Sequence, residues 1–207
     1  MVGVVNYGMG NLHSIARKLH LLKVDFQLIE NPEAVQNCSH LILPGVGHFG
    51  KAMQSLEEKG LLNALNQFVL IEKKPILGIC LGMQLMAKFS EEGNVTGLGW
   101  VDTKIVRFKV SDTQKYKVPH IGWNGVEGKG SKLLGEEINE FYFVHSYHAE
   151  VPNEVVVLHK TVYDTEFISG FEKGNIFGVQ YHPEKSHQHG MEMIRRFLEV
   201  GSEEFRM

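Results

Sequence analysis

Short apolar runs and amphipathic segments alternate along the first half of the chain. Four short runs rich in apolar residues predict strands: 2–6, 25–30, 41–43 and 76–79. Three segments repeat apolar residues every three or four positions and predict helices: 12–22, 51–58 and 61–73. A shorter helix is expected to begin at Pro32, because proline suits the first helical position. Strands that alternate with helices in this way indicate a parallel sheet covered on both faces.

The second half of the chain has strand-like segments that no long helix separates. Four of them are 101–110, 141–147, 154–160 and 166–171. The segment Lys173-Gly174-Asn175 predicts a hairpin turn into a returning strand, 176–182. A last helix is expected from Ser186, with Met191, Ile194, Phe197 and Leu198 on one face. We therefore expect a single α/β domain, 1–207, whose central sheet is mostly parallel, flanked by helices and more antiparallel in its second half.

The segment 76–87 carries the clearest chemical signal. Gly78 and Gly82 flank Cys80 at the spacing of the nucleophile elbow, G-x-S-x-G, with cysteine in place of serine. The apolar run before Cys80 predicts a strand, and residues 81–87 predict the first turns of a helix. Glycines suit such a sharp turn because it leaves little room for Cβ atoms. A thiol at a helix N-terminus favours the thiolate form, so we interpret Cys80 as a nucleophile rather than an inert buried cysteine.

Two glycine-containing loops are expected to lie beside Cys80. Residues 7–11 and 44–47 both follow predicted parallel strands. The carboxyl ends of such strands share one edge of the sheet, where ligands bind. In elbow enzymes the amide after the nucleophile, here Leu81, is one oxyanion donor, and a loop after a neighbouring strand gives the second. The loop 44–47 is placed to do so, although a plain tight turn is the alternative.

The segment His182-Pro183-Glu184 supplies a candidate base with its support. Residues at i and i+2 of an extended segment point to the same side, so Glu184 can orient the imidazole of His182. The competing base, His145, has no neighbouring carboxylate, and we expect it to be structural or to line the substrate site. His187 and His189 lie near His182, but no cysteine or carboxylate cluster completes a metal site. We therefore expect no metal and no cofactor.

The composition limits the partners and the compartment. The net charge of the 207 residues is −3 and the basic residues are scattered, which argues against nucleic acid and anionic membranes. The two cysteines, Cys38 and Cys80, do not form a disulfide framework. We see neither a signal peptide nor a membrane-length apolar run, so a cytoplasmic protein is expected.

The elbow and His182-Pro183-Glu184 together resemble the class I, or triad, glutamine amidotransferases, which have a flavodoxin-like fold. The resemblance covers nearly the whole chain. Four segments narrow it to the glutaminase subunits of imidazole glycerol phosphate synthases: 44–49, 119–124, 142–147 and 180–186. The segment Pro119-His120-Ile121-Gly122-Trp123-Asn124 is the most specific for this branch.

The resemblance implies a role for each residue of the site. Cys80 would attack the side-chain amide of glutamine, His182 would move the protons, and Glu184 would orient His182. The oxyanion would be stabilised by Gly45, Val46, Gly47 and Leu81, after a peptide there reorients on partner binding. Residues implied to bind or line the glutamine site are Gln84, Glu92, His145, Ser146 and Tyr147. For Glu92 the alternative is a solvated loop carboxylate.

The resemblance also implies a partner. The ammonia would pass to a (β/α)₈-barrel cyclase, which makes imidazole glycerol phosphate and an aminoimidazole carboxamide ribotide. The interface would include residues 7–11, with Asn11, and also Trp123, Asn124 and Tyr142. Trp123 as a plain core residue is the alternative. A chain of 207 residues has no room for a synthase domain of its own, which independently favours a heterodimer.

Three other functions compete with this one. A paralogue would feed ammonia to a different synthetase, for example one that forms an acetamidino group on a sugar. A stand-alone cysteine hydrolase of γ-glutamyl amides would turn over fully without a partner. A catalytically dead binding subunit is disfavoured by the intact Cys80, His182 and Glu184. The identity of the partner and the effect of that partner on turnover distinguish these functions.

Overall fold

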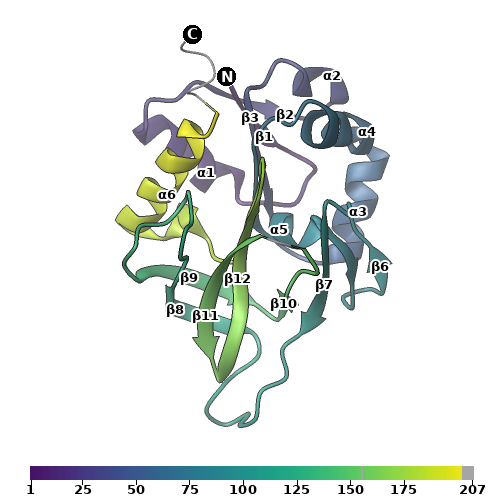
Figure 1. The fold of residues 1–207 in the computed structure, drawn as a ribbon. Coiled ribbons are helices and arrows are strands. Elements are labelled where there is room, and N and C mark those ends of the chain that lie inside the picture. Colours follow the sequence, from purple (N-terminus) through teal and green to yellow (C-terminus); the bar gives the residue numbers. More distant parts are fainter. Residues whose placement is uncertain (155, 202–207) are drawn as a thin grey trace.

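The computed structural model describes residues 1–154 and 156–201. Among these residues, eleven strands form one sheet, in the order β2-β1-β3-β4-β13-β12-β10-β7-β5-β6 with β11 on β12, and β8 and β9 form a second sheet (Figure 1). The strands at the centre of the first sheet are β2 (Phe26–Ile29), β1 (Val2–Val5), β3 (His40–Gly45), β4 (Ile76–Cys80) and β13 (Ile176–Val179). All neighbours among these five strands pair in parallel. The expected parallel centre is confirmed.

Two layers of helices cover this centre. They are α1 (Leu12–Leu21), α2 (Pro32–Val35), α3 (Phe49–Glu58), α4 (Leu61–Asn66) with a π-helical turn Gln67–Ile71, α5 (Leu81–Leu85) and α6 (His187–Glu199). Successive side chains of β3 point to opposite faces. Leu41 and Leu43 pack in the cluster that contains α3 and α4, and Ile42 packs in the cluster that contains α1 and α6. Figure 1 shows α1 and α6 on one side of the sheet and α2, α3 and α4 on the other.

The remaining strands extend the sheet, mostly in antiparallel pairs. They are β12 (Thr165–Lys173), β11 (Val157–Tyr163), β10 (Tyr147–Ala149), β7 (Val101–Arg107), β5 (Ala87–Ser90) and β6 (Val95–Thr96). Neighbouring strands from β13 to β7 pair antiparallel, as do β11 with β12 and β5 with β6, whereas β5 and β7 are parallel. The more antiparallel second half is therefore confirmed. Of the strand expected over 154–160, residue 155 lies outside the described residues, as do residues 202–207 of the expected domain.

Two helix predictions were wrong in detail. The helix after Cys80 ends at Leu85 rather than at residue 87, and β5 follows at once. The helix can stop there because the carbonyls of Leu85 and Met86 accept hydrogen bonds from the backbone N–H groups of Leu98 and Val101. The helix expected over 61–73 changes to a π-helical turn after Asn66.

The sequence also failed to predict a second sheet. Strand β8 (His120–Val126) pairs antiparallel with β9 (Asn139–His145). Gly122, Asn124 and Gly125 are poor strand formers, and the pairing with β9 overrides that preference. A short 3₁₀ turn, Pro183–Lys185, leads from the end of β13 toward α6. In the described residues we find no helix with the length and apolar character that a bilayer crossing requires.

Candidate active site

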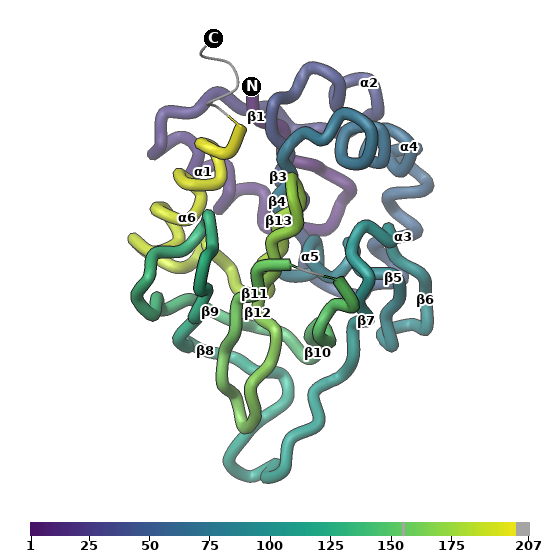
Figure 2. Tube along the Cα trace, viewed as in Figure 1, coloured from purple at the N-terminus to yellow at the C-terminus, as the bar shows by residue number. Residues whose placement is uncertain are grey.

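Three strand ends meet at one edge of the sheet. The traces of β3, β4 and β13 run side by side through the centre of the molecule, and α5 begins at their end (Figure 2). Strands β3 and β4 are in register so that Gly45 lies opposite Cys80. The expected position of the loop 44–47 beside Cys80 is confirmed.

Cys80 sits in a strained turn. Its φ is 53° and its ψ is −110°, a region that residues other than glycine rarely adopt. A Cβ atom on Gly82 would lie 1.7 Å from the carbonyl oxygen of Leu43, and one on Gly78 would lie 2.7 Å from the carbonyl oxygen of Gly82. Both glycines are therefore required by close backbone contact. The elbow places the thiol at the tip of β4, as its glycine spacing predicted.

His182 and Glu184 form a buried pair beside this thiol. Nδ1 of His182 lies 2.7 Å from Oε1 of Glu184. The other ring nitrogen, Nε2, is buried and makes no hydrogen bond of standard geometry within the described residues. Burial on its own would lower the pKa of His182, but the charge of the neighbouring Cys80 thiolate and the Glu184 carboxylate together raise it to about 10. The three side chains have the order of a nucleophile, a base and an orienting carboxylate.

Gln180 is a contact of Cys80 that sequence analysis missed. Its side-chain Nε2 lies 3.5 Å from Sγ of Cys80. Its Oε1 accepts a hydrogen bond of 2.9 Å from Nε2 of Gln84. Gln84 also donates to the backbone carbonyl of Tyr147, at 3.2 Å. One signal could have found Gln180, because it precedes His182 by two residues in an extended segment and so points to the same side.

A small cavity opens beside the thiol. Its volume is about 280 Å³, which is just below the range of roughly 300–1,000 Å³ for drug-sized ligands and suits an amino acid. The residues that line it are Val46, Gly47, Cys80, Leu81, Gln84, Glu92, Pro119, Val144, His145, Ser146 and Tyr147. The structure thus brings together all the residues expected at the glutamine site and three of the four expected at the oxyanion.

Gly45, the fourth, lies just behind this cavity. A Cβ atom on Gly45 would lie 2.5 Å from the hydroxyl of Tyr7 and 2.7 Å from Cβ of Leu81. Tyr7 is completely buried, and its hydroxyl donates a 2.8 Å hydrogen bond to the carbonyl of Pro44. Burial and the charge of Cys80 raise the pKa of Tyr7, so its hydroxyl stays protonated. The expectation that residue 7 lines a partner interface is therefore wrong, and Tyr7 instead fixes the end of β3.

Glu92 and His145 also contact the backbone around the cavity. Oε2 of Glu92 accepts a 2.8 Å hydrogen bond from the backbone N–H of Phe49, at the start of α3. Nδ1 of His145 lies 2.8 Å from the carbonyl of Tyr147. Burial lowers the pKa of His145 to about 3 despite that hydrogen bond, so its ring is neutral. Within the described residues, His145 has no carboxylate partner, and it forms a wall of the cavity rather than a supported base.

The residues expected at a partner interface lie on or near the surface, on β8, on β9 and at the start of α1. The side chain of Trp123 is 46% exposed, so it is not a core residue, and its ring stacks on His187 at 5.0 Å. The amine of Lys185 lies 5.5 Å above the ring of Tyr142. Asn11 accepts a 3.3 Å hydrogen bond from the N–H of Ser14 and caps α1. These positions are compatible with an interface.

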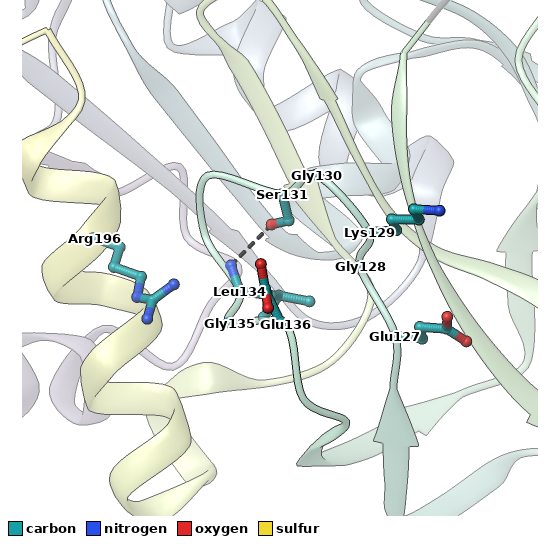
Figure 3. Close-up of a pocket in the computed structure, with 9 residues that line it drawn as sticks. All are labelled: Glu127, Gly128, Lys129, Gly130, Ser131, Leu134, Gly135, Glu136 and Arg196. Carbon is teal, nitrogen blue, oxygen red and sulfur yellow. Dashed lines mark hydrogen bonds between the residues drawn. The ribbon is translucent and has the colours of Figure 1, made fainter.

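A larger cavity lies away from Cys80. Its volume is about 650 Å³, and it lies between the loop after β8 and α6 (Figure 3). Arg196 of α6 points toward the loop that carries Ser131 and Leu134, and Glu127, Lys129 and Glu136 complete a rim of mixed charge. None of the residues that line it also lines the cavity beside Cys80.

Residues 3–200 match the family model described as Glutamine amidotransferase class-I. The chain therefore belongs to the class-I glutamine amidotransferases, and the family expected from its sequence is confirmed. It is similar over nearly its full length to proteins named imidazole glycerol phosphate synthase subunit HisH 2. The one from Methanococcus maripaludis is 44% identical over 201 residues, which are 96% of this chain and 98% of the relative. The one from Pseudomonas aeruginosa is 39% identical over 203 residues, which are 97% of this chain and 100% of the relative.

A solved structure supports the fold class independently. The crystal structure titled as a glutamine amidotransferase has a TM-score of 0.78 to this chain and covers 97% of it, with 98% of its own chain covered. The two sequences are 19% identical, so this likeness concerns the fold alone. The expected α/β architecture is confirmed.

Proposed function

We propose that this chain, as one domain over 1–207, hydrolyses glutamine with a Cys80-His182-Glu184 triad and supplies ammonia to a (β/α)₈-barrel cyclase of an imidazole glycerol phosphate synthase. The observation that carries the proposal is the buried line of these three side chains beside a cavity of about 280 Å³. The similarity to named subunits of that synthase supports the choice of partner.

The proposed reaction begins with the thiolate of Cys80. The Cys80 thiolate and Glu184 raise the pKa of His182 to about 10, so the ring that faces this thiolate is an imidazolium. The sulfur attacks the side-chain carbonyl carbon of glutamine, a C–S bond forms, and the carbonyl oxygen becomes an oxyanion. The N–H of Leu81 and donors from the loop 44–47 stabilise it. His182 gives its proton to the departing nitrogen, the C–N bond breaks, and ammonia leaves.

The second half of the reaction releases glutamate. Neutral His182 accepts a proton from a water molecule as the water oxygen attacks the thioester carbon. The C–S bond then breaks, which restores the Cys80 thiolate beside the His182 imidazolium. Glu184 keeps Nδ1 of His182 as the donor throughout, so that Nε2 always faces the sulfur and the substrate.

The cavity suits a zwitterionic amino acid. Glu92 brings a carboxylate to one side of it, which favours the α-ammonium group of glutamine. The backbone of Ser146 and Tyr147 lines another side and is the proposed site for the α-carboxylate. Gln84 also lines the cavity, and two hydrogen bonds hold its side chain. The side-chain amide of glutamine then reaches the sulfur.

The proposed cyclase-binding surface centres on β8. Ile121 is 58% exposed and Trp123 is 46% exposed, and neighbouring apolar side chains on a surface mark protein interfaces. Asn11, Asn124 and Tyr142 complete the proposed contact. We place the complex in the cytoplasm, where the small-molecule substrate would be found.

A second candidate differs only in the recipient of the ammonia. Both relatives from Methanococcus maripaludis and Pseudomonas aeruginosa carry the number 2 in their names. Because of that numbering, our alternative is a paralogous subunit that has another synthetase as its partner. Its glutaminase site would be the same.

The test is the glutaminase rate of the purified chain with and without a barrel cyclase and its phosphoribulosyl formimino nucleotide. We expect weak turnover alone and strong stimulation by the complex. Ile121→Asp should abolish the stimulation, whereas Leu28→Asp, at an exposed aliphatic position on β2, should keep it. Full turnover of the chain alone would favour a stand-alone hydrolase, and stimulation by another synthetase would favour the paralogue.

A further inference from the structure

A chain of hydrogen bonds leads from β8 into the candidate active site. Nδ2 of Asn124 lies 3.4 Å from Nε2 of His120. Nδ1 of His120 lies 3.1 Å from Nε2 of His145. Nδ1 of His145 lies 2.8 Å from the carbonyl oxygen of Tyr147. The proposed chemistry at Cys80 uses none of these three side chains.

The inner end of this chain fixes both imidazole tautomers. The carbonyl of Tyr147 can only accept, so Nδ1 of His145 carries the hydrogen. In a neutral ring Nε2 of His145 is then an acceptor, and Nδ1 of His120 must donate to it. Nε2 of His120 is left as an acceptor that needs a donor.

The outer end requires the same tautomers independently. Oδ1 of Asn124 accepts a 2.8 Å hydrogen bond from the N–H of Gly125, and its Nδ2 donates at 2.9 Å to the carbonyl of Val162. These two contacts distinguish the nitrogen from the oxygen of the Asn124 side-chain amide. The second hydrogen of Nδ2 then points to Nε2 of His120, the acceptor that the inner end leaves. Both ends therefore assign the same direction of donation.

Burial keeps the rings of His120 and His145 in the neutral tautomers that these hydrogen bonds require. It lowers the pKa of His120 to about 4 and that of His145 to about 3, so both rings are neutral at physiological pH. The ring of His120 also stacks on Phe143 and Tyr163, at centroid distances of 4.8 Å and 4.0 Å. A ring held on two sides has little freedom to rotate away from its partners.

The chain ends on the groups that surround the nucleophile. The carbonyl of Tyr147 also accepts from Gln84, whose second amide hydrogen goes to Gln180, and Nε2 of Gln180 contacts Sγ of Cys80. The geometry points to His120 and Asn124 as positioning residues, which act through His145 to hold the Tyr147 carbonyl, Gln84 and Gln180 in the arrangement that serves Cys80. This inference rests on the proposed glutaminase function and adds residues to it.

This chain of hydrogen bonds connects the candidate active site with the proposed contact surface for the cyclase. Asn124 lies on β8 next to Trp123, which is exposed and belongs to the proposed contact surface. A shift of β8 on binding would move His120 relative to His145 of β9 and would reach the wall of the cavity through rings that have little freedom. The surface strand and the nucleophile are thereby connected by side chains rather than by the sheet.

The activity test compares three variants of the full-length protein with glutamine as substrate. His120→Phe keeps a stacking ring but removes both nitrogens, and we expect kcat to fall about tenfold with a smaller change in KM. His120→Asn keeps a donor at the place of Nδ1, so it should recover most of that loss. His148→Phe removes another histidine whose Nδ1 lies 3.0 Å from a backbone carbonyl, that of Ala149, and should keep the wild-type kcat. A wild-type kcat for His120→Phe, or an equal loss in His148→Phe, would overturn the inference.

A second measurement is independent of turnover. Nitrogen-15 NMR of the wild-type protein should find His145 protonated on Nδ1 only, and His120→Phe should change the signal of His145 Nε2 because that atom loses its donor. A hydrogen on Nε2 of wild-type His145, or an unchanged signal in the variant, would contradict the proposed chain of hydrogen bonds. If the wild-type protein does not hydrolyse glutamine, the proposed function fails instead, and the NMR result still decides whether the chain of tautomers exists.

Discussion

Nδ1 of His182 and Oε1 of Glu184 lie 2.7 Å apart, with only Pro183 between them in the chain. The turn over Pro183–Lys185 is 3₁₀-helical and buries both side chains. The hydroxyl of Ser186 donates a 2.6 Å hydrogen bond back to the carbonyl of His182 and closes the turn. The orientation of the base is therefore fixed locally, by the five consecutive residues 182–186, before any substrate binds.

Removing either member of this pair should reduce glutamine hydrolysis severely. For His182→Ala we expect kcat to fall roughly ten-thousandfold, as for a triad base. For Glu184→Gln we expect a fall of comparable order, because the amide can present its N–H to Nδ1 and stabilise the wrong tautomer of His182. Steady-state rates of glutamate release measure both.

His145→Ala tests whether His182, and not His145, is the base. His145 lines the cavity beside Cys80, but its ring is neutral and it has no carboxylate partner in the part of the chain that the structure describes. Its loss should be much smaller than that of His182→Ala. If His145→Ala were the more damaging substitution, His145 would be the base and our assignment of His182 would be wrong.

The charge of the Cys80 thiolate should be visible in the titration of His182. Burial favours the neutral ring, and the thiolate and Glu184 oppose burial and raise the pKa of His182 from 6.5 to about 10. In Cys80→Ala only the carboxylate opposes burial, so the pKa of His182 should fall below its wild-type value and the ring should lose its proton at a lower pH. NMR titration between pH 5 and pH 11 measures the change, and an unchanged pKa would mean that His182 does not face the thiolate.

Tyr7 gives a test of how the end of β3 is held. Tyr7→Phe removes only the hydroxyl that donates at 2.8 Å to Pro44, next to Gly45 of the proposed oxyanion loop. We expect a loss of about 1 kcal/mol in the free energy of unfolding and a fall in kcat that exceeds the change in KM, because oxyanion donors act mainly in the transition state.

Tyr163→Phe is the matched control for Tyr7→Phe. It also removes a 2.8 Å hydrogen bond from a tyrosine hydroxyl to a backbone carbonyl, that of Lys117, at an exposed site. Phenylalanine keeps the ring that stacks on His120, so Tyr163→Phe should leave kcat unchanged. Equal effects of the two substitutions on kcat would show that Tyr7 has no special connection with the oxyanion loop.

The sequence predicted the centre of the fold better than its periphery. The strands that contain Val4, Ile42 and Leu77 are short, apolar on both faces and separated by amphipathic helices, so local pattern and tertiary role agree. Strand β8 was missed because its glycines and Asn124 carry little strand preference, and because residues 127–138 separate it from its partner, β9. Pairing between distant segments does not appear in a local pattern.

The residues of the candidate site also divide into those that the sequence predicts and those that it does not. Cys80, His182 and Glu184 were predictable, because glycine spacing and a two-residue separation are visible in the sequence. Gln180 and Tyr7 were missed, because their contacts with Cys80 and Pro44 join residues that are 100 and 37 positions apart. The chain through His120 was also invisible, since it depends on ring orientation and on the amide of Asn124.

The most direct test of the account is glutamate release by Cys80→Ala beside Cys38→Ala. Both cysteines are buried and free, but only Cys80 lines the cavity next to His182 and Glu184. In the presence of the activating partner, we expect Cys80→Ala to remain folded and to release no glutamate above background, while Cys38→Ala retains turnover. Glutamine hydrolysis by folded Cys80→Ala would contradict the assignment of the nucleophile.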